Sequence, residues 1–282
     1  MKTEHINGHI TAITPIHHGG DESTGARSTL RRIKYIVDGK RVEIPVISGN
    51  SIRGVLRRLI MSHMLETLGY GKRTEDGEAD DRMKSMKAYH MLFSGGTLES
   101  VEDSGSIDLA LRRELRSSLP ALSVFGSAIG NQMIEGKFKC GIAVPVCKEL
   151  ESFLPGETPT NSIYELLVDD FSTRKDDLHG EREKDEAAHQ MIVNFECFAP
   201  GTVFTHKFIL LDCNEVERAV IDKAIQLWIS RPYIGGKSSI GYGEVKLNYG
   251  IPQTGSFAYD TFIKDNADSM RETIEKIEGI LK

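Results

Sequence analysis

No stretch of this 282-residue sequence contains the roughly 18 consecutive apolar residues that a membrane-spanning helix needs. The first residues, MKTEHINGHITAI, also lack the basic segment and the following apolar segment of a secretory signal peptide. We therefore expect a cytoplasmic protein without a membrane partner.

Cysteine is scarce, and none of the four cysteines forms a CxxC pair. Histidines do not join them in a zinc-binding pattern. We interpret Cys140, Cys147, Cys197 and Cys213 as reduced residues of the core. We expect neither a metal site nor a cofactor.

Positive charge is in the minority, because the formal net charge is −6. This balance argues against a protein that coats nucleic acid with its whole surface. The acidic residues gather in 99–108 and 169–186, whereas the basic residues are concentrated elsewhere. An acidic protein of this kind can still have a local basic groove. The basic residues concerned are Arg27, Arg31, Arg32, Lys34, Lys40, Arg41, Arg53, Arg57 and Arg58.

The first third of the chain predicts strands followed by a helix. Residues 5–16 alternate as a strand does, and the DG at 38–39 lies between two β-rich runs, which favours a hairpin. Apolar residues at helical spacing from Ile52 to Leu65 predict a helix, which Ser48, Asn50 or Ser51 could cap.

The rest of the chain alternates polar insertions with regular elements. We expect an inserted segment at 70–108 with a helix at 80–93, a short helix at 108–118, a loop over LPALSVFGSAIG, and a strand in KFKCGIAVPVC. A second polar excursion at 155–190 precedes two strands separated by an APG turn, an amphipathic helix from 214, the strand GEVKLNY and a C-terminal helix at 257–282. This order indicates a single α+β domain over 1–282, with a ferredoxin-like or RNA-recognition-motif-like core, a mainly antiparallel sheet and long insertions.

The segment 231–245, RPYIGGKSSIGYGEV, has more glycine than a plain turn requires. Gly235, Gly236, Gly241 and Gly243 permit positive φ and leave backbone N–H groups open to an anion. Neither the GxxxxGK[ST] nor the GxGxxG spacing is present. A phosphate contact and an ordinary glycine-rich connection are both compatible with the segment.

Two other segments carry candidate chemistry. In ISGNSIRGVLRR, small polar residues precede a helix whose N-terminus can bind phosphate, Arg53 and Arg57 share a face, and Gly54 leaves room for another backbone. The alternative is a capped, solvent-exposed helix start. HHGGD at 17–21 could hold a metal or a general base, but we favour a polar loop that touches RNA. The histidines of the 155–190 excursion lie in a charge run that is more typical of a solvated surface than of a catalytic site.

Taken together, four segments resemble the repeat-associated mysterious protein (RAMP) superfamily of CRISPR effector subunits. They are IPVISGNSIRGVLRRL, LPALSVFGSAIG, NFECFAPGTVF and YIGGKSSIGYGEV, and they occur in the family's order. The sequences of the second and third segments resemble type I or type IV backbone subunits more closely than type III subunits.

This resemblance implies a hand-shaped RNA-recognition fold, with a finger-like insertion at 70–108 and a thumb-like excursion at 155–190. Copies of the chain would stack head-to-tail along a CRISPR guide RNA, beside other effector subunits, and the guide would pair with target DNA or RNA. Phe125 would be a packing residue. The residues implied to contact RNA are His18, Ser48, Asn50, Ser51, Arg53, Arg57, Arg174, Gln190, Gly235, Gly236, Lys237, Ser238 and Ser239.

Two other functions stay open. Type III relatives cleave target RNA with an aspartate in the loop after the HxGG-like turn, and Asp21 is the candidate here. The following loop, TGARSTLRRIK, carries bases and hydroxyls where an acid is expected, so we favour a non-catalytic scaffold over an Mg²⁺-dependent ribonuclease. A protein-interaction module without nucleic acid is the third reading.

Overall fold

The computed structural model describes residues 2–24, 27–71, 86–96, 108–130, 132–175, 190–251 and 255–281. The centre of the protein is an antiparallel sheet. Its strands lie in the order β13 (Val245–Tyr249), β1 (Thr3–Ala12), β12 (Val203–Leu211) and β8 (Phe138–Cys140). The short β9 (Val144–Pro145) also pairs with β12. All the neighbouring strands are antiparallel.

In chain order, helix α1 (Gly49–Thr67) lies between β1 and β8, and helix α5 (Glu215–Ser230) lies between β12 and β13. The core is therefore two interleaved β–α–β units, which is the ferredoxin-like arrangement that the sequence predicts. This confirms the α+β fold class with a mainly antiparallel sheet.

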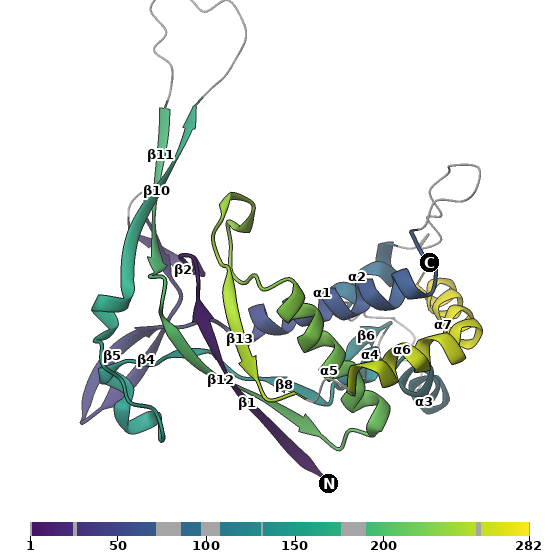
Figure 1. The fold of residues 1–282 in the computed structure, drawn as a ribbon. Coiled ribbons are helices and arrows are strands. Elements are labelled where there is room, and N and C mark those ends of the chain that lie inside the picture. Colours follow the sequence, from purple (N-terminus) through teal and green to yellow (C-terminus); the bar gives the residue numbers. More distant parts are fainter. Residues whose placement is uncertain are drawn as a thin grey trace, which may run out of the picture.

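The two core helices cover one face of the sheet (Figure 1). In β1 the buried residues alternate, so that Ile6, Ile10 and Ala12 face the helices. The helices pack against these residues with apolar side chains at i, i+4 spacing, as in Ile52, Leu56 and Ile60 of α1. The opposite face of the sheet is not covered by these helices.

The α-helical side is completed by short helices and by the C-terminal region. It contains α2 (Met86–Ser94), α3 (Leu109–Ser118), α4 (Pro120–Phe125), α6 (Gly255–Asp265) and α7 (Ala267–Ile280), with the small hairpin of β6 (Ser127–Ile129) and β7 (Gln132–Ile134). The predicted helix at 80–93 is α2 in its described part.

Two predictions for this side are wrong. LPALSVFGSAIG is not a loop, because Pro120 begins α4 and Gly126, at φ 66°, ends it. The C-terminal 257–282 is not one helix, because Asn266 leaves the helical conformation between α6 and α7. Phe125 is fully buried beside Phe138, with ring centroids 5.3 Å apart, which confirms its packing role.

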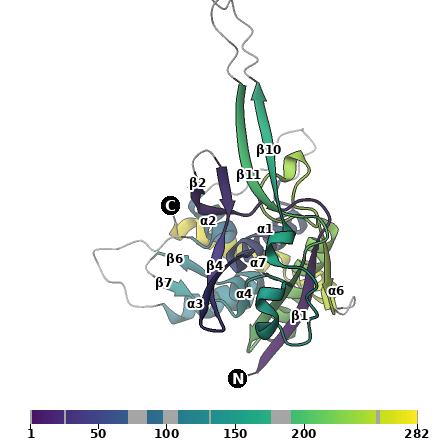
Figure 2. The ribbon, with the colours of Figure 1, turned by 90° about the vertical axis from the view of Figure 1, so that its left-hand side faces the viewer.

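A second sheet projects from the body. It has the order β10 (Leu167–Lys175), β11 (Gln190–Phe198), β3 (Arg27–Leu30) and β2 (Gly19–Thr24). The β10–β11 hairpin stands out from the rest of the molecule in two perpendicular views (Figure 1 and Figure 2). The predicted excursion at 155–190 thus contains a regular strand, and two 3₁₀ turns, η1 (Lys148–Phe153) and η2 (Ile163–Leu166), precede that strand.

The predicted DG hairpin is confirmed as β4 (Arg32–Val37) and β5 (Lys40–Pro45). Asp38 and Gly39 have φ values of 48° and 73°, as a two-residue hairpin turn requires. The four cysteines are free thiols. Within the described ranges, no helix is both long enough and apolar enough to cross a lipid bilayer.

Candidate nucleic-acid interface

Three segments that the sequence analysis singled out meet at His17 and His18. The Gly236 N–H donates to the His17 carbonyl at 2.8 Å, and this ties the glycine-rich segment to the connection between β1 and β2. The Ser48 N–H donates to Nε2 of His18 at 3.2 Å, which ties in the start of α1. We refer to residues 17–18, 48–53 and 234–243 together as the junction.

His18 must be neutral to accept the Ser48 N–H. Burial lowers the pKa of His18, and the positive charges of Arg31 and His17 lower it further. The Arg31 N–H also donates to the His18 carbonyl at 3.0 Å, so the exposed Arg31 is held beside the junction. The sequence analysis placed Arg31 in a basic run but did not select it as a contact residue.

The start of α1 presents a positive electrostatic field. Ser48 is the N-cap, and its Oγ accepts the Ser51 N–H at 3.2 Å. The first turn of α1, which the structure describes in full, contains no acidic residue, so no side chain there offsets the helix dipole. Asn50 is exposed on this turn.

Gly54 lies one turn into α1 and leaves open space at the surface. A Cβ built there would meet only the guanidinium of Arg58, at 3.3 Å, within the described part of the chain. No backbone from another described element enters the space, and the flexible Arg58 side chain can give way to a ligand backbone.

Arg57 is a correction to the predicted contact set. Its side chain is only 4% exposed and donates to the carbonyl oxygens of Leu92, Met91 and Gly126. Burial lowers the pKa of Arg57 to about 10, and the neighbouring Arg53 contributes to the shift. Arg57 therefore ties α1 to α2 and to the end of α4, and we leave it out of the RNA-binding set.

Arg53, at the edge of the junction nearest to this cluster, is half-buried. It donates to the Phe125 carbonyl, and its guanidinium carbon lies 5.8 Å from the Phe125 ring centroid. Burial lowers the pKa of Arg53. The side chain is thus fixed in place and keeps a partly exposed cationic edge.

The glycine-rich loop needs its glycines for conformation and for close packing. Gly235 has φ 83°, and a Cβ there would lie 2.6 Å from the His17 carbonyl oxygen. Gly243 has φ 82°, and a Cβ there would overlap the Ile234 carbonyl oxygen. These two residues hold the loop so that Ser238 and Ser239 are exposed at its tip, in the 3₁₀ turn η3 (Ser238–Ile240).

The loop is also attached to the base of the projecting hairpin. The ammonium of Lys237 lies 4.1 Å from the centroid of the Phe195 ring, a cation–π contact with β11. The Tyr242 hydroxyl donates to the Asp170 carboxylate of β10. This hydrogen bond is the main cause that raises the pKa of Tyr242 to about 12.

Three acidic residues near the junction are paired within the protein. Arg32 binds both carboxylate oxygens of the buried Glu196, at 2.6 and 2.7 Å, and Arg27 is paired with Asp169. Because these carboxylates and Asp170 have partners, they repel an incoming phosphate less than free carboxylates would.

Three other predicted residues lie on strands at positions where the structure does not describe the side chains. Arg174 is at the end of β10, Gln190 is at the start of β11, and Asp21 is in β2. Among the described residues there is no cluster of three or more His, Cys, Asp or Glu side chains that could hold a metal.

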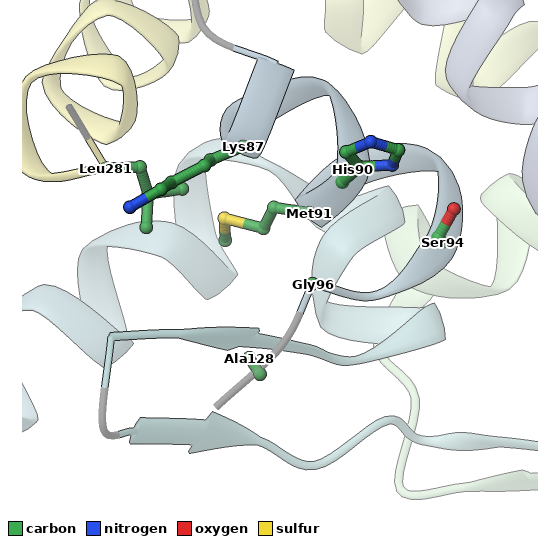
Figure 3. A pocket seen from close by; sticks show the side chains of 7 residues that line it. All are labelled: Lys87, His90, Met91, Ser94, Gly96, Ala128 and Leu281. Atoms are coloured by element: carbon green, nitrogen blue, oxygen red, sulfur yellow. The ribbon is translucent and has the colours of Figure 1, made fainter. Parts of the chain in front are cut away.

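A hollow of about 280 Å³ lies away from the junction, between α2, β6 and the end of the C-terminal region (Figure 3). It has a mixed lining with one lysine, one histidine and an apolar floor, and none of its residues belongs to the predicted contact set. They are Lys87, His90, Met91, Ser94, Gly96, Ala128 and Leu281.

The fold and the junction together define an RNA-recognition-like α+β protein with a glycine-rich loop beside its first helix. The model of the RAMP superfamily matches residues 9–246, and the chain belongs to this superfamily. Among solved structures, a chain described as "Type IV-B CRISPR Complex" has a similar fold, with a TM-score of 0.62 and 22% sequence identity over 87% of this chain and 90% of that chain. No curated protein matches the sequence.

Proposed function

We propose that the protein is a backbone subunit of a CRISPR effector complex and that it binds guide RNA at the junction. The observation that carries the proposal is the convergence of the glycine-rich loop and the start of α1 on His17 and His18. Both segments offer backbone N–H groups and cations, and the neighbouring Asp169 and Glu196 are paired. Membership of the RAMP superfamily and the fold shared with the chain from a type IV-B complex support it.

At the junction, the phosphates of the guide contact the start of α1 and the loop tip. Arg31, Arg53 and Lys237 supply positive charge, and Asn50 and Ser51 supply polar groups at the helix start. Gly235 and Gly236 bring the loop backbone close, and Ser238 and Ser239 add hydroxyl groups. Because these contacts reach phosphates and not base edges, we expect little preference for guide sequence and a steep loss of affinity with salt.

The projecting β10–β11 hairpin is the proposed thumb, and the region that includes α2 is the proposed finger. Copies stack head-to-tail along the guide in the cytoplasm, with other effector subunits, and the guide pairs with target DNA or RNA. A hairpin that stands out from one side suits a heterologous interface, in which one surface of a copy meets a different surface of the next. Arg174 and Gln190 belong to this hairpin and stay in the proposed contact set.

The test is assembly on RNA. The chain is co-expressed with a CRISPR array, and its absorbance ratio at 260 and 280 nm and its size by gel filtration are recorded. We expect a large, nucleic-acid-rich species for the wild type and a smaller, nucleic-acid-poor one for Arg31→Ala/Lys237→Ala. The matched control is Arg113→Ala/Lys264→Ala, which removes the same charges from exposed sites on α3 and α6.

A wild-type chain that stays monomeric and free of RNA, even with added guide, would contradict the proposal. The assembled complex also tests the alternative activity, in which Asp21 and Mg²⁺ cleave the target RNA. We expect intact target after incubation with Mg²⁺. Regularly spaced cuts that disappear in Asp21→Ala would replace the scaffold function with that of a ribonuclease.

A further inference from the structure

The face of the central sheet that lies away from α1 and α5 has an unusual charge pattern. We call it the open face, and in Figure 1 the helices lie on the other side of the sheet. The strand register and the alternating burial of β1, β8, β12 and β13 define which side chains point to it. They are Thr3, His5, Asn7, His9, Thr11, Lys139, Val203, Thr205, Lys207, Ile209, Leu211, Lys246 and Asn248.

Among these outward positions of the four described strands there is no Asp or Glu, although the whole chain has a net charge of −6. Lys139, Lys207 and Lys246 are all exposed, and they lie on a diagonal across the sheet. The register places Lys139 opposite Ile209, two residues along β12 from Lys207, so their Cβ atoms are about 7–8 Å apart. Lys246 lies opposite Thr11, further along the same diagonal.

A hollow of about 590 Å³ opens on this face beside Lys207. Its polar lining includes the exposed amides of Asn7 and Asn248, and its apolar wall includes Phe153, which is 49% exposed. The Phe153 ring meets Tyr35 edge-on, at 5.7 Å between centroids, so it is supported from behind. An aromatic ring, amides and a lysine around one hollow are the groups that bind an unpaired nucleotide.

One acid reaches the hollow. Glu157 is paired with His9, with 2.6 Å between the carboxylate oxygen and Nε2. The pair leaves the three lysines as the dominant charge of the face. A polar, lysine-bearing surface is also unlike the core of a protein–protein interface, where lysine is depleted and apolar residues dominate.

We propose that the open face is a second binding site for single-stranded nucleic acid, separate from the junction. The phosphates follow the lysine diagonal, and one base stacks on Phe153 while Asn7 and Asn248 meet its edge. An RNA-recognition motif stacks bases on aromatic residues of its strands, but the outward positions of these strands carry no Phe, Tyr or Trp, so the ring comes from η1 instead.

The test maps contacts on the full chain with photo-crosslinking. The probes are a 12-nucleotide RNA with 4-thiouridine and a DNA of matched sequence with 4-thiothymidine, and crosslinked peptides are identified by mass spectrometry. We expect two groups of crosslinks, one at the junction and one within residues 139–153 and 203–211. The RNA and DNA arms show which strand type the open face prefers.

Variants separate the two sites. Lys139→Ala/Lys207→Ala/Lys246→Ala should remove the open-face crosslinks and leave those at the junction, whereas Arg31→Ala/Lys237→Ala should do the reverse. In the Arg31→Ala/Lys237→Ala background, loss of the three lysines should make the slope of log affinity against log salt concentration shallower by about 2. Phe153→Ala should weaken binding there roughly five- to hundredfold. The Lys→Arg triple variant should restore binding, and thermal melts check folding.

Failure at the open face is distinguishable from failure of the proposed function, because each variant leaves the other site intact. The proposal is overturned if the wild type gives no crosslinks on the open face or if the lysine variant keeps them. Self-association without nucleic acid that the lysine variant abolishes would assign the face to a second copy of the chain and would also overturn it.

Discussion

The junction and the cluster around Arg57 lie one helical turn apart on α1, yet they use polar groups in opposite ways. Around Arg57, the donors of the guanidinium are met by carbonyl groups of the protein itself. At the junction, the start of α1 and the tip of the glycine-rich loop are exposed, and the first turn of α1 contains no acidic residue. An arginine next to a binding motif is available to a ligand only if the fold leaves some of its donors exposed.

Arg57→Ala should have the largest effect on stability. It leaves several buried carbonyl groups without a donor, which we expect to cost about 3 kcal/mol or more. Urea unfolding measures this cost, and Arg113→Ala, at an exposed site, is the control. A wild-type unfolding midpoint for Arg57→Ala would show that the cluster does not stabilise the fold and would reopen a role in RNA binding.

Acid should act on the packed side of the molecule through His206. Its Nδ1 accepts from the Tyr249 hydroxyl at 2.8 Å, and its Nε2–H donates to the Gly141 carbonyl at 3.0 Å. Burial lowers the pKa of His206 to about 4. Because the pKa of His206 in the folded protein is below the unfolded value of about 6.5, neutral His206 contributes to the free energy of unfolding above pH 6.5. This contribution, about 3 kcal/mol in total, is lost as pH falls towards 4.

Unfolding free energies measured between pH 7 and 4 test this expectation, with His206→Gln as the comparison. The variant should be less stable at pH 7 and should show a smaller decline with acid. An equal decline in both proteins would mean that other groups control the acid response.

A pair of glycine variants probes the junction itself. Gly243→Ala places a Cβ against the Ile234 carbonyl at φ 82°, and we expect a loss of about 2 kcal/mol together with weaker RNA binding. Gly241→Ala has similar backbone strain, at φ 93°, but no atom lies within 4 Å of its Cβ. It should cost about 1 kcal/mol and spare RNA affinity. Equal effects would show that the close packing at Gly243 is unimportant.

Tyr242→Phe should have the smallest effect on stability, under about 1 kcal/mol, because it removes one hydrogen bond at a partly exposed site. The pKa of Tyr242 is raised to about 12, so its contribution is present below the unfolded value of about 10 and is lost as pH rises through 12. The variant should therefore lose less stability than the wild type between pH 10 and 12. Filament length on RNA, measured at pH 7, checks whether this bond also sets the hairpin's orientation.

The parts of the fold that the sequence predicts are those with local causes. The Asp38–Gly39 turn, the Ser48 cap and the apolar spacing of α1 are each decided within a few residues. The parallel pairing of β11 with β3 joins distant segments, and no local pattern encodes it.

The candidate site shows the same division. The glycine-rich loop and the helix start were predicted from their residues, but their meeting at His17 and His18 comes from tertiary structure. The inward direction of Arg57 depends on α2 and α4, which pack over its turn. Pro120 and Gly126 did carry a readable signal for α4, namely a proline at a helix start and a glycine at its end.

The hydrogen bond between His17 and Gly236 also bears on how the protein matures. His17 leaves the ribosome early and Gly236 late, separated by roughly 10 to 45 s at ordinary rates of synthesis. β1 likewise cannot pair until its neighbours, β12 and β13, have been synthesised, so the sheet of the nascent chain is incomplete for most of its synthesis. The hydrogen bond that holds the glycine-rich loop against His17 therefore forms only when the polypeptide is nearly finished.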